Sequence, residues 1–147
     1  MLENVMRVTK SNKRLVRKPR GQGMNWIRPV KRLAIYGRDG FACVWCGVTI
    51  EDGTRLTLDH CVPYSNGGSN HETNLVTSCL RCNSSRGTRS LAAFARAVAT
   101  YLNQGLRSAE ILNHARRCRA RKLDMDGAKA LIERRGSLAA VLRRNTK

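Results

Sequence analysis

The sequence has few acidic residues, few aromatic residues and no long apolar run. Asp and Glu number 10 against 28 Lys and Arg, which gives a net charge of +18. A positive field of this size attracts polyanions, so nucleic acid is the leading candidate partner, ahead of an anionic membrane surface. No stretch of about 18 apolar residues occurs, which argues against a transmembrane helix.

Aromatic residues make up only 5% of the 147 residues and hydrophobic residues 41%, so we expect a small aliphatic core. The basic N-terminal stretch lacks the apolar segment of a signal peptide, and we therefore expect the protein to be cytoplasmic. In a reducing compartment, paired cysteines indicate metal binding rather than disulfides. The chain has six: Cys43, Cys46, Cys61, Cys79, Cys82 and Cys118.

Local composition divides the chain into three parts. Residues 1–25 are basic, carry the stretch RKPRGQG and lack apolar periodicity, which is typical of a flexible arm, either solvated or phosphate-binding. Residues 26–90 contain both cysteine pairs and are expected to form the functional domain. Residues 91–147 combine helical spacing with many arginines, which indicates a basic helical subdomain. This subdomain is either a plain helical cap or a second nucleic-acid surface.

Helix signals can be located within these parts. Residues 26–38 fit a short helix with Pro29 in the first turn. Beyond residue 90 we expect four helices, and Met125 should point inward from the third of them. The stop and cap signals of these helices are Gly105, Ser108, Asp124, Gly136 and Ser137.

Two CxxC pairs are the strongest local signal. CVWC supplies Cys43 and Cys46, and CLRC supplies Cys79 and Cys82. Two residues between cysteines let both sulfurs face one ion. Four thiolates close a tetrahedral zinc site with no open position, so we expect a structural zinc ion.

The segment between the pairs, residues 47–78, is 32 residues long and exceeds the spacing of about 15–20 in a short four-cysteine finger. RLTLDHCVP favours a strand whose pairing fails at Pro63, because proline cannot donate to a ladder. SNGGSN favours a turn, NLVTSC a second strand and CNSSRGTRSLAAF a helix. Cys61 and Cys118 lack a CxxC partner and are expected to be small buried residues.

Asp59 and His60 are neighbours on the first of these strands. Asp59 is a hard oxygen ligand suited to Mg²⁺ or Mn²⁺, and Asn83 at the start of the helix offers a second oxygen. His60 has the basicity to take a proton from water near neutral pH. Adjacent strand residues point to opposite faces, so both can share a site only if the strand twists, bulges or ends there. The pair by itself leaves a structural histidine and a catalytic one open.

The stretches RDGFACVWCG, LTLDHCVPYSNGGSNHETNLVTSC and CLRCNSSRG together resemble the HNH endonucleases, the ββα-metal nucleases with a CxxC…CxxC zinc clamp. The resemblance covers about residues 30–90. It implies an α+β fold, with a small zinc-stabilised, treble-clef-like ββα-metal core and a helical C-terminal extension. It also implies an HNH nuclease domain at residues 26–90 that hydrolyses DNA to 5′-phosphate and 3′-hydroxyl ends.

The resemblance assigns roles to four residues. His60 matches the general base, and Asp59 matches the acidic ligand of the catalytic divalent metal. Asn74 matches the asparagine that braces the loop between the strands and helps to orient the base. Asn83 matches the third signature position, where many members have histidine. Replacing that imidazole by an amide oxygen favours Mg²⁺ or Mn²⁺ over softer ions.

Other expectations concern binding. Arg86 and Arg89 follow on the helix, either to clamp phosphates or as a solvated basic face. His71 is expected to be an exposed loop residue, and we assign no role to His114. Double-stranded DNA is the expected partner, without a membrane, and a homodimer or a phage or restriction protein is a possible second partner. The alternatives are an HNH-fold module that binds nucleic acid without cutting, and a phage packaging or restriction helper that needs a partner to cut.

Overall fold

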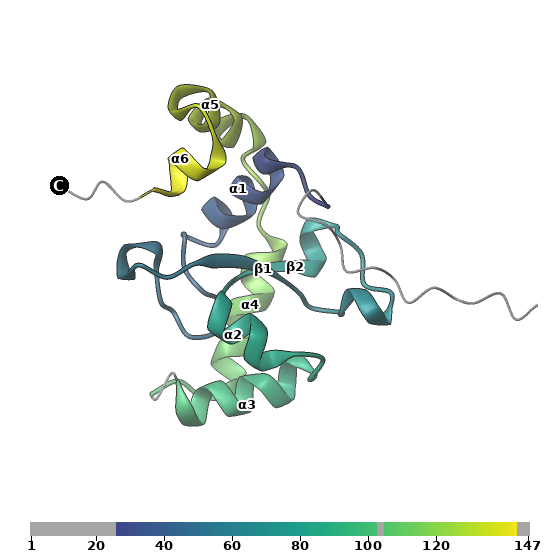
Figure 1. Cartoon of the computed structure of the whole chain (residues 1–147). Helices are drawn as coiled ribbons and strands as arrows, with labels where there is room; N and C mark the ends of the chain where they lie inside the picture. Colours follow the sequence, from purple (N-terminus) through teal and green to yellow (C-terminus); the bar gives the residue numbers. More distant parts are fainter. Residues whose placement is uncertain (1–25, 103–104, 144–147) are drawn as a thin grey trace, which may run out of the picture.

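The computed structural model describes residues 26–102 and 105–143, so the arm expected at residues 1–25 lies outside the described residues. A two-stranded antiparallel sheet occupies the centre (Figure 1). Its strands are β1 (Leu56–His60) and β2 (Leu75–Cys79), in regular register from Leu56 opposite Cys79 to His60 opposite Leu75. The expected strand–loop–strand order is confirmed, and β1 ends at His60, before Pro63.

Six α-helices and three short 3₁₀ helices make up the rest of the described elements. In Figure 1, α1, α5 and α6 lie on one side of the sheet and α2 and α3 on the other, while α4 runs past β2. The α-helices are α1 (Pro29–Arg38), α2 (Leu80–Arg86), α3 (Leu91–Tyr101), α4 (Ser108–Ala120), α5 (Met125–Arg135) and α6 (Leu138–Leu142). The 3₁₀ helices are η1 (Ile50–Asp52), η2 (Tyr64–Asn66) and η3 (Glu72–Asn74).

The helix that follows the second cysteine pair is shorter than the sequence predicts. One helix is expected through CNSSRGTRSLAAF, but α2 ends at Arg86 and Gly87 adopts a φ of 55°. Glycine takes positive φ without steric cost, and Ser90 then caps a new helix by accepting from the Ala93 N–H at 3.1 Å. The break lets α3 turn and pack against α4.

Most predicted helix signals are confirmed. Pro29 is the first residue of α1, and the Asp124 and Ser137 side chains cap α5 and α6. Two details were wrong. Arg107, not Ser108, is the N-cap of α4, and its N–H donates to the Glu110 carboxylate at 2.7 Å. Met125 is 41% exposed instead of pointing inward, because the first turn of α5 faces solvent.

One hydrophobic cluster joins the cysteine centre to α3 and α4. Phe94 packs edge-to-face against Trp45 with ring centroids 5.6 Å apart, so aromatic rings contribute more to the core than their scarcity suggested. The division of the chain at residue 90 stays a prediction. The buried members of the cluster are Cys43, Val44, Trp45, Cys61, Val76, Cys79, Cys82, Phe94, Ala95, Val98, Ile111, Ala115 and Cys118.

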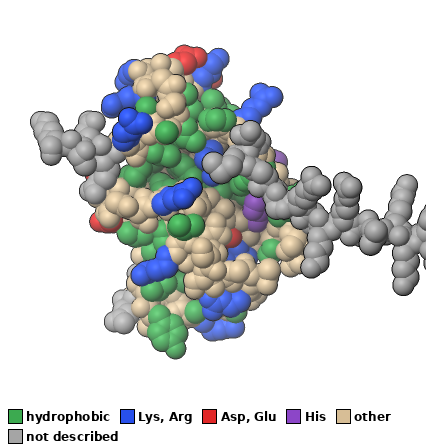
Figure 2. Space-filling model, viewed as in Figure 1, with side chains coloured by type: hydrophobic (Ala, Val, Ile, Leu, Met, Phe, Trp, Pro, Cys, Tyr) green, Lys and Arg blue, Asp and Glu red, His purple; other side chains and the backbone are tan. Residues whose placement is uncertain are grey.

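The surface carries the basic charge of the chain. On the face drawn in Figure 2, Lys and Arg side chains lie at the top, in the middle and at the bottom, and acidic side chains are few. None of the helices among the described residues has the length and apolar character needed to cross a membrane.

Candidate metal centre and active site

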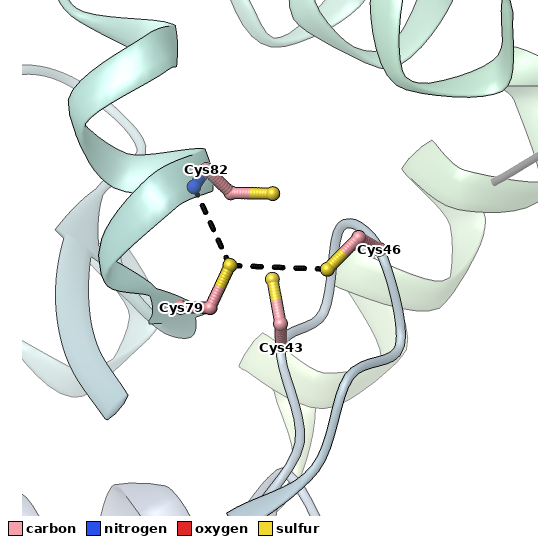
Figure 3. Close-up of side chains that lie close together, drawn as sticks. All are labelled: Cys43, Cys46, Cys79 and Cys82. Carbon is pink, nitrogen blue, oxygen red and sulfur yellow. Dashed lines mark hydrogen bonds between the residues drawn. The ribbon is translucent and has the colours of Figure 1, made fainter. Parts of the chain in front are cut away.

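The four cysteines of the CxxC pairs meet at one point. Their sulfur atoms all lie within 4.8 Å of one another, and the Sγ atoms of Cys46 and Cys79 are 3.8 Å apart (Figure 3). Sulfurs bound at about 2.3 Å to one tetrahedral ion would be about 3.8 Å apart, so the cluster fits a zinc ion. The four sulfurs can therefore hold a metal ion such as zinc, as the spacing predicted.

Local backbone geometry builds this cluster. The first pair lies in a tight turn in which the Gly47 N–H donates to the Cys43 carbonyl at 2.9 Å, and Gly47 has a φ of 79°. The second pair lies at the junction of β2 and α2, where Cys79 is the N-cap and its Sγ accepts from the Cys82 N–H at 3.4 Å. The Val44 N–H donates to the Thr77 carbonyl of β2 at 2.9 Å, which holds the first cysteine pair beside the second.

The thiols of the cluster share negative charge. Hydrogen bonds from the Cys46 and Cys82 thiols lower the pKa of Cys43 to about 2. The same interaction with Cys43 raises the pKa of Cys46 to about 11 and that of Cys82 as well. The neighbouring thiols thus stabilise the Cys43 thiolate. Four adjacent thiolates would repel one another, so they require a cation.

The two remaining cysteines behave as core residues, as predicted. Cys61 is 6% exposed and Cys118 is fully buried. Burial raises the pKa of Cys61 to about 11 and also raises the pKa of Cys118. Both thiols are therefore protonated near neutral pH and lie outside the four-sulfur cluster.

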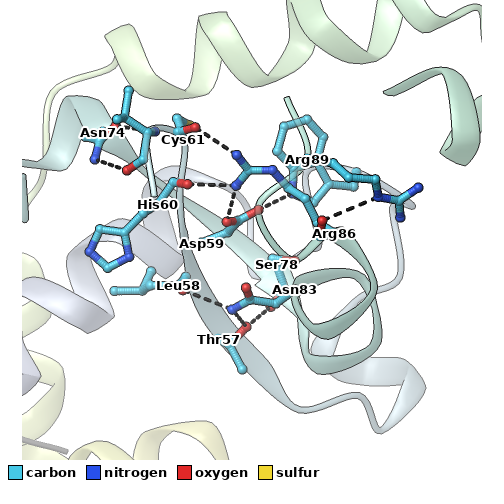
Figure 4. Close-up of polar contacts among 12 residues, drawn as sticks. Thr57, Leu58, Asp59, His60, Cys61, Asn74, Ser78, Asn83, Arg86 and Arg89 are labelled. Carbon is cyan, nitrogen blue, oxygen red and sulfur yellow. Dashed lines mark hydrogen bonds and ion pairs between the residues drawn. The ribbon is translucent and has the colours of Figure 1, made fainter. Parts of the chain in front are cut away.

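Asp59 points from β1 toward α2 and is only 4% exposed. Its Oδ2 accepts from the Trp45 indole at 3.0 Å, and its Oδ1 forms an ion pair with Arg86 (Figure 4). Burial raises the pKa of Asp59 above its ordinary value, and the Arg86 guanidinium and the Trp45 hydrogen bond oppose that rise. Both carboxylate oxygens are therefore already engaged by protein donors.

Asn83 lies on the same side of β1 as Asp59. Its Nδ2 donates to Thr57 Oγ1 at 2.9 Å and to the Leu58 carbonyl at 3.1 Å. Its Oδ1 has no hydrogen-bond partner among the described residues. An amide oxygen and a carboxylate are donors suited to a hard divalent cation. The residue types therefore fit Mg²⁺ or Mn²⁺, although a cation would have to share Asp59 with Arg86.

His60 is the last residue of β1 and points away from the Asp59 carboxylate (Figure 4). The regular register through His60 explains this, because adjacent residues of a strand face opposite sides. The ring is half-buried, and its Nε2 lies 2.8 Å from Asn70 Oδ1. β1 therefore ends at His60, which meets one of the conditions under which Asp59 and His60 could share a site. The strand has no bulge there, so the two side chains are not turned toward each other.

Asn74 ties together the loop between the strands. Its Oδ1 accepts from the Val62 N–H at 2.8 Å, and its Nδ2 donates to the carbonyls of Val62 at 3.1 Å and Ser69 at 2.8 Å. Its own carbonyl accepts from the Cys61 N–H at 2.8 Å. These bonds hold the backbone directly after His60, which is the arrangement that a loop-bracing asparagine needs.

Arg86 does not lie on an exposed basic face. It is 2% exposed and donates to the His60 carbonyl at 2.7 Å and the Cys61 carbonyl at 2.8 Å, besides pairing with Asp59. The expectation of a phosphate clamp is therefore corrected for Arg86, because its guanidinium is used inside the fold. Arg89 is exposed, donates to the Ser85 carbonyl at 2.7 Å and lies over the Phe94 ring at 5.2 Å.

The other two histidines are not members of the four-sulfur cluster. His71 is exposed and caps η3 by accepting from the Thr73 N–H at 3.2 Å. His114 lies on α4 with its Nε2 3.7 Å from Cys118 Sγ.

Sequence reasoning missed three groups that support the site. Trp45, inside the first CxxC pair, links the cysteine knuckle to Asp59. Arg38 and Asp39 form a buried ion pair, and Asp39 accepts from the Thr77 N–H at 2.8 Å. Asn70 contacts His60 from a loop rich in polar residues. Of these groups, only Trp45 could have been found from the sequence, because a buried indole N–H between two paired cysteines needs a hydrogen-bond partner.

Comparisons with known proteins concern the same segment. Residues 43–99 match the family model described as HNH endonuclease. The CRISPR-associated endonuclease Cas9 of Actinomyces naeslundii is 41% identical over 68 residues, which are 46% of this chain and 6% of that protein. The crystal structure of the Type II-C Cas9 enzyme from Actinomyces naeslundii is 27% identical, with a TM-score of 0.45, and the match covers 80% of this chain and 11% of that chain. The chain thus spans a small part of these relatives.

Proposed function

Since residues 43–99 belong to the HNH endonuclease family, we propose that this protein hydrolyses phosphodiester bonds of double-stranded DNA with His60 as the general base. The observation that carries the proposal is the setting of His60. The residue ends β1, its Nε2 is engaged by Asn70, and its Nδ1 has no hydrogen-bond partner among the described residues. A half-buried imidazole with one unengaged nitrogen is suited to accept a proton from water.

The proposed reaction is an attack by water on phosphorus. His60 takes a proton from the water through Nδ1 as the water oxygen forms a bond to phosphorus. The bond from phosphorus to the 3′ oxygen breaks, its electron pair stays on that oxygen, and a proton from solvent completes the 3′-hydroxyl. The products are a 5′-phosphate and a 3′-hydroxyl. A general base of this kind contributes about 10²–10⁴ in rate.

Asp59 and Asn83 are the proposed ligands of a divalent cation, and Mg²⁺ or Mn²⁺ suits their oxygen atoms. Such a cation, when bound, supplies charge that stabilises the phosphate and the leaving oxygen. Asn83 presents its Oδ1 because its Nδ2 is fixed by Thr57 and Leu58. Asp59 is held by Trp45 and Arg86, so its carboxylate stays at a defined position on β1.

A basic pocket of about 580 Å³ supports DNA as the substrate. It lies beside the loop that carries Asn70, and Lys31, Arg119, Arg121 and Lys122 contribute its four cationic side chains. Arg119 is fixed there because its Nε donates to the Thr73 carbonyl at 2.6 Å. Cations gathered beside the loop whose Asn70 contacts His60 suit a phosphate backbone, whose neutralisation drives DNA binding.

The four-cysteine cluster is proposed to hold structural zinc. Its sulfurs come from the two segments that flank β1 and the loop after it, so one ion would fix both ends of the proposed catalytic segment. Structural zinc supplies folding free energy in small domains of this type. The cluster leaves no ligand position for water or substrate, which separates it from the hydrolytic site.

Cleavage of supercoiled plasmid tests the proposal. We expect the wild-type protein to nick or linearise DNA with Mg²⁺ or Mn²⁺ and not with EDTA. His60→Ala should still bind DNA and cut it about 10²–10⁴-fold more slowly. His71→Ala, which removes an exposed histidine of the neighbouring loop, is the matched control and should cut normally. Equal cutting by wild type and His60→Ala would refute His60 as the base.

A second candidate function is DNA binding without cleavage by the isolated chain. The observation that favours it is the buried ion pair of Asp59 with Arg86, which occupies the carboxylate proposed as a metal ligand. The same plasmid experiment separates the two. DNA binding by the metal-loaded wild type without any nicking would support the binding function, or a nuclease that needs a partner protein.

A further inference from the structure

Asn70 contacts the ring of His60 in a way that defines where the ring proton lies. Its side-chain Oδ1 is 2.8 Å from His60 Nε2. An amide oxygen only accepts hydrogen bonds, so Nε2 must carry the proton. In a neutral imidazole the lone pair is then on Nδ1.

The position of Asn70 is fixed from both sides. Lys31 on α1 donates from Nζ to the Asn70 carbonyl at 3.1 Å, and the same ammonium pairs with Glu72 at 3.2 Å. The preceding residue, Ser69, is held by the Asn74 amide. The backbone of Asn70 is therefore anchored to α1 through Lys31 and to the loop held by Asn74, which fixes the side chain of Asn70 beside His60.

Two aromatic rings limit the motion of the imidazole. The Trp26 ring lies 4.8 Å from the His60 ring, centroid to centroid, at an angle of 35°. The Tyr64 ring lies 6.1 Å away at 53°. Ring packing of this kind restricts rotation of the imidazole but does not choose which nitrogen carries the proton. That choice falls to the polar contact with Asn70.

We propose that Asn70 is a positioning residue that holds His60 in the tautomer with the proton on Nε2 and thereby keeps Nδ1 ready to accept a proton from water. The proposal rests on the proposed role of His60 as the general base. It adds a residue that the family signature in this sequence did not single out. Asn70 acts through His60 and does not touch the reacting atoms.

The tautomer can be measured without any cleavage assay. We would record ¹⁵N-detected long-range spectra of the histidine rings in the full-length, zinc-loaded protein at a pH where His60 is neutral, and identify His60 by its loss in His60→Ala. Wild type should show a protonated Nε2 and an unprotonated Nδ1. Asn70→Ala should show a mixture of both tautomers, and Asn70→Asp, which keeps an acceptor oxygen, should retain the wild-type pattern. An unchanged tautomer in Asn70→Ala would overturn the proposal.

Kinetics add a second readout. Asn70→Ala should lower kcat by about 10-fold or more with little change in KM, since the base is misoriented but the substrate surface is intact. Asn70→Asp should restore much of the rate, because its carboxylate oxygen also accepts a hydrogen bond from Nε2. The control is Asn66→Ala, an exposed asparagine of the same loop.

The two hypotheses fail in different ways. If wild type does not cut DNA but Asn70→Ala still mixes the tautomers, the proposed function fails and the Asn70–His60 relationship stands. If wild type cuts and Asn70→Ala cuts at the same rate, Asn70 has no positioning role. Should Asn70→Ala fail to fold, Asn70→Asp still decides, because loss of the wild-type tautomer in a variant that keeps the acceptor oxygen would overturn the proposal.

Discussion

One guanidinium nitrogen of Arg86, Nη1, donates both to the carboxylate of Asp59 and to the carbonyl oxygen of His60. The second terminal nitrogen donates to the Cys61 carbonyl, while Nε has no partner among the described residues. A buried arginine from α2 therefore connects the proposed metal ligand with the backbone of the proposed base. It fixes the end of β1 in the fold rather than contacting the substrate.

Arg86 should be important for stability. Arg86→Met leaves the buried Asp59 carboxylate without a cation, and we expect a loss of about 3–5 kcal/mol in the free energy of unfolding. Adding Asp59→Asn should recover part of that loss, which chemical denaturation of the zinc-loaded protein would reveal. The matched control is Arg81→Met, an exposed arginine of the same helix, which should change stability by about 0.5 kcal/mol or less. Similar losses for both variants would contradict the structural role of the ion pair.

Asn83 and Thr57 allow the ligand role of Asn83 to be separated from its structural role. Asn83→Ala removes both the free Oδ1 and the bonds to β1, so metal-dependent cleavage should be lost. Thr57→Val removes one partner of Nδ2 but leaves Oδ1, and we expect metal-dependent cleavage to be retained. Activity titrated with Mg²⁺ and Mn²⁺ measures this difference. A requirement for metal that is the same in Asn83→Ala as in wild type would exclude Asn83 as a ligand.

Removal of the proposed zinc ion should expose all six cysteines together. Cys61 and Cys118 share a hydrophobic cluster with three of the four sulfur ligands, so loss of a structural ion should open the whole cluster. Before chelation, Cys61 should resist alkylation at neutral pH because burial raises its pKa to about 11. Mass spectrometry after alkylation, with and without a zinc chelator, counts the modified thiols. Four fast and two protected thiols after chelation would mean that the core survives without the ion.

The burial of Cys61 also predicts a dependence of stability on pH. Its folded pKa of about 11 lies above the ordinary value of 9.0. The folded state thus binds more protons than the unfolded state between these values, and stability falls as pH rises from about 9 to 11. Cys61→Ala should remove this part of the alkaline loss. Denaturation series at pH 8 and pH 11 measure it, and identical pH dependence in both proteins would contradict the assignment.

The basic pocket beside the Asn70 loop should contribute to DNA affinity. Arg121→Gln with Lys122→Gln should weaken binding, and the slope of log K against log salt should become shallower by about 0.9 for each phosphate that is no longer neutralised. Lys129→Gln with Arg135→Gln removes the same charge from exposed positions on α5 that do not line this pocket. Affinity measured over a range of salt concentrations compares the two pairs. Equal effects would show that only net charge matters.

Several features of the fold were accessible from the sequence because their causes are local. CxxC spacing brings two sulfurs toward one ion whatever the rest of the fold, and Asp124 and Ser137 cap helices through bonds within three residues. The alternating stretch before His60 formed the predicted strand. Proline at position 63 marked the region where pairing stops.

The orientation of the site residues could not be predicted, because it depends on partners distant in sequence. Asp59 faces inward since Trp45 and Arg86 reach it from 14 and 27 residues away. The helix break at Gly87 was not predicted, because helical spacing continues on both sides of it. The contact between Asn70 and His60 depends on a loop whose composition carries no periodic signal.

The two cysteine pairs bring the ends of residues 47–78 together, because the sulfurs of Cys46 and Cys79 are 3.8 Å apart. Between these ends the segment forms the central sheet, and β2 packs against α1 and α4. Doubling the length of a flexible loop adds only about 0.6 kcal/mol to the entropy cost of closing it. Extra residues are therefore best accommodated in the exposed turn at residues 64–67, whereas exchange of β1 or β2 would remove the sheet against which α1 and α4 pack.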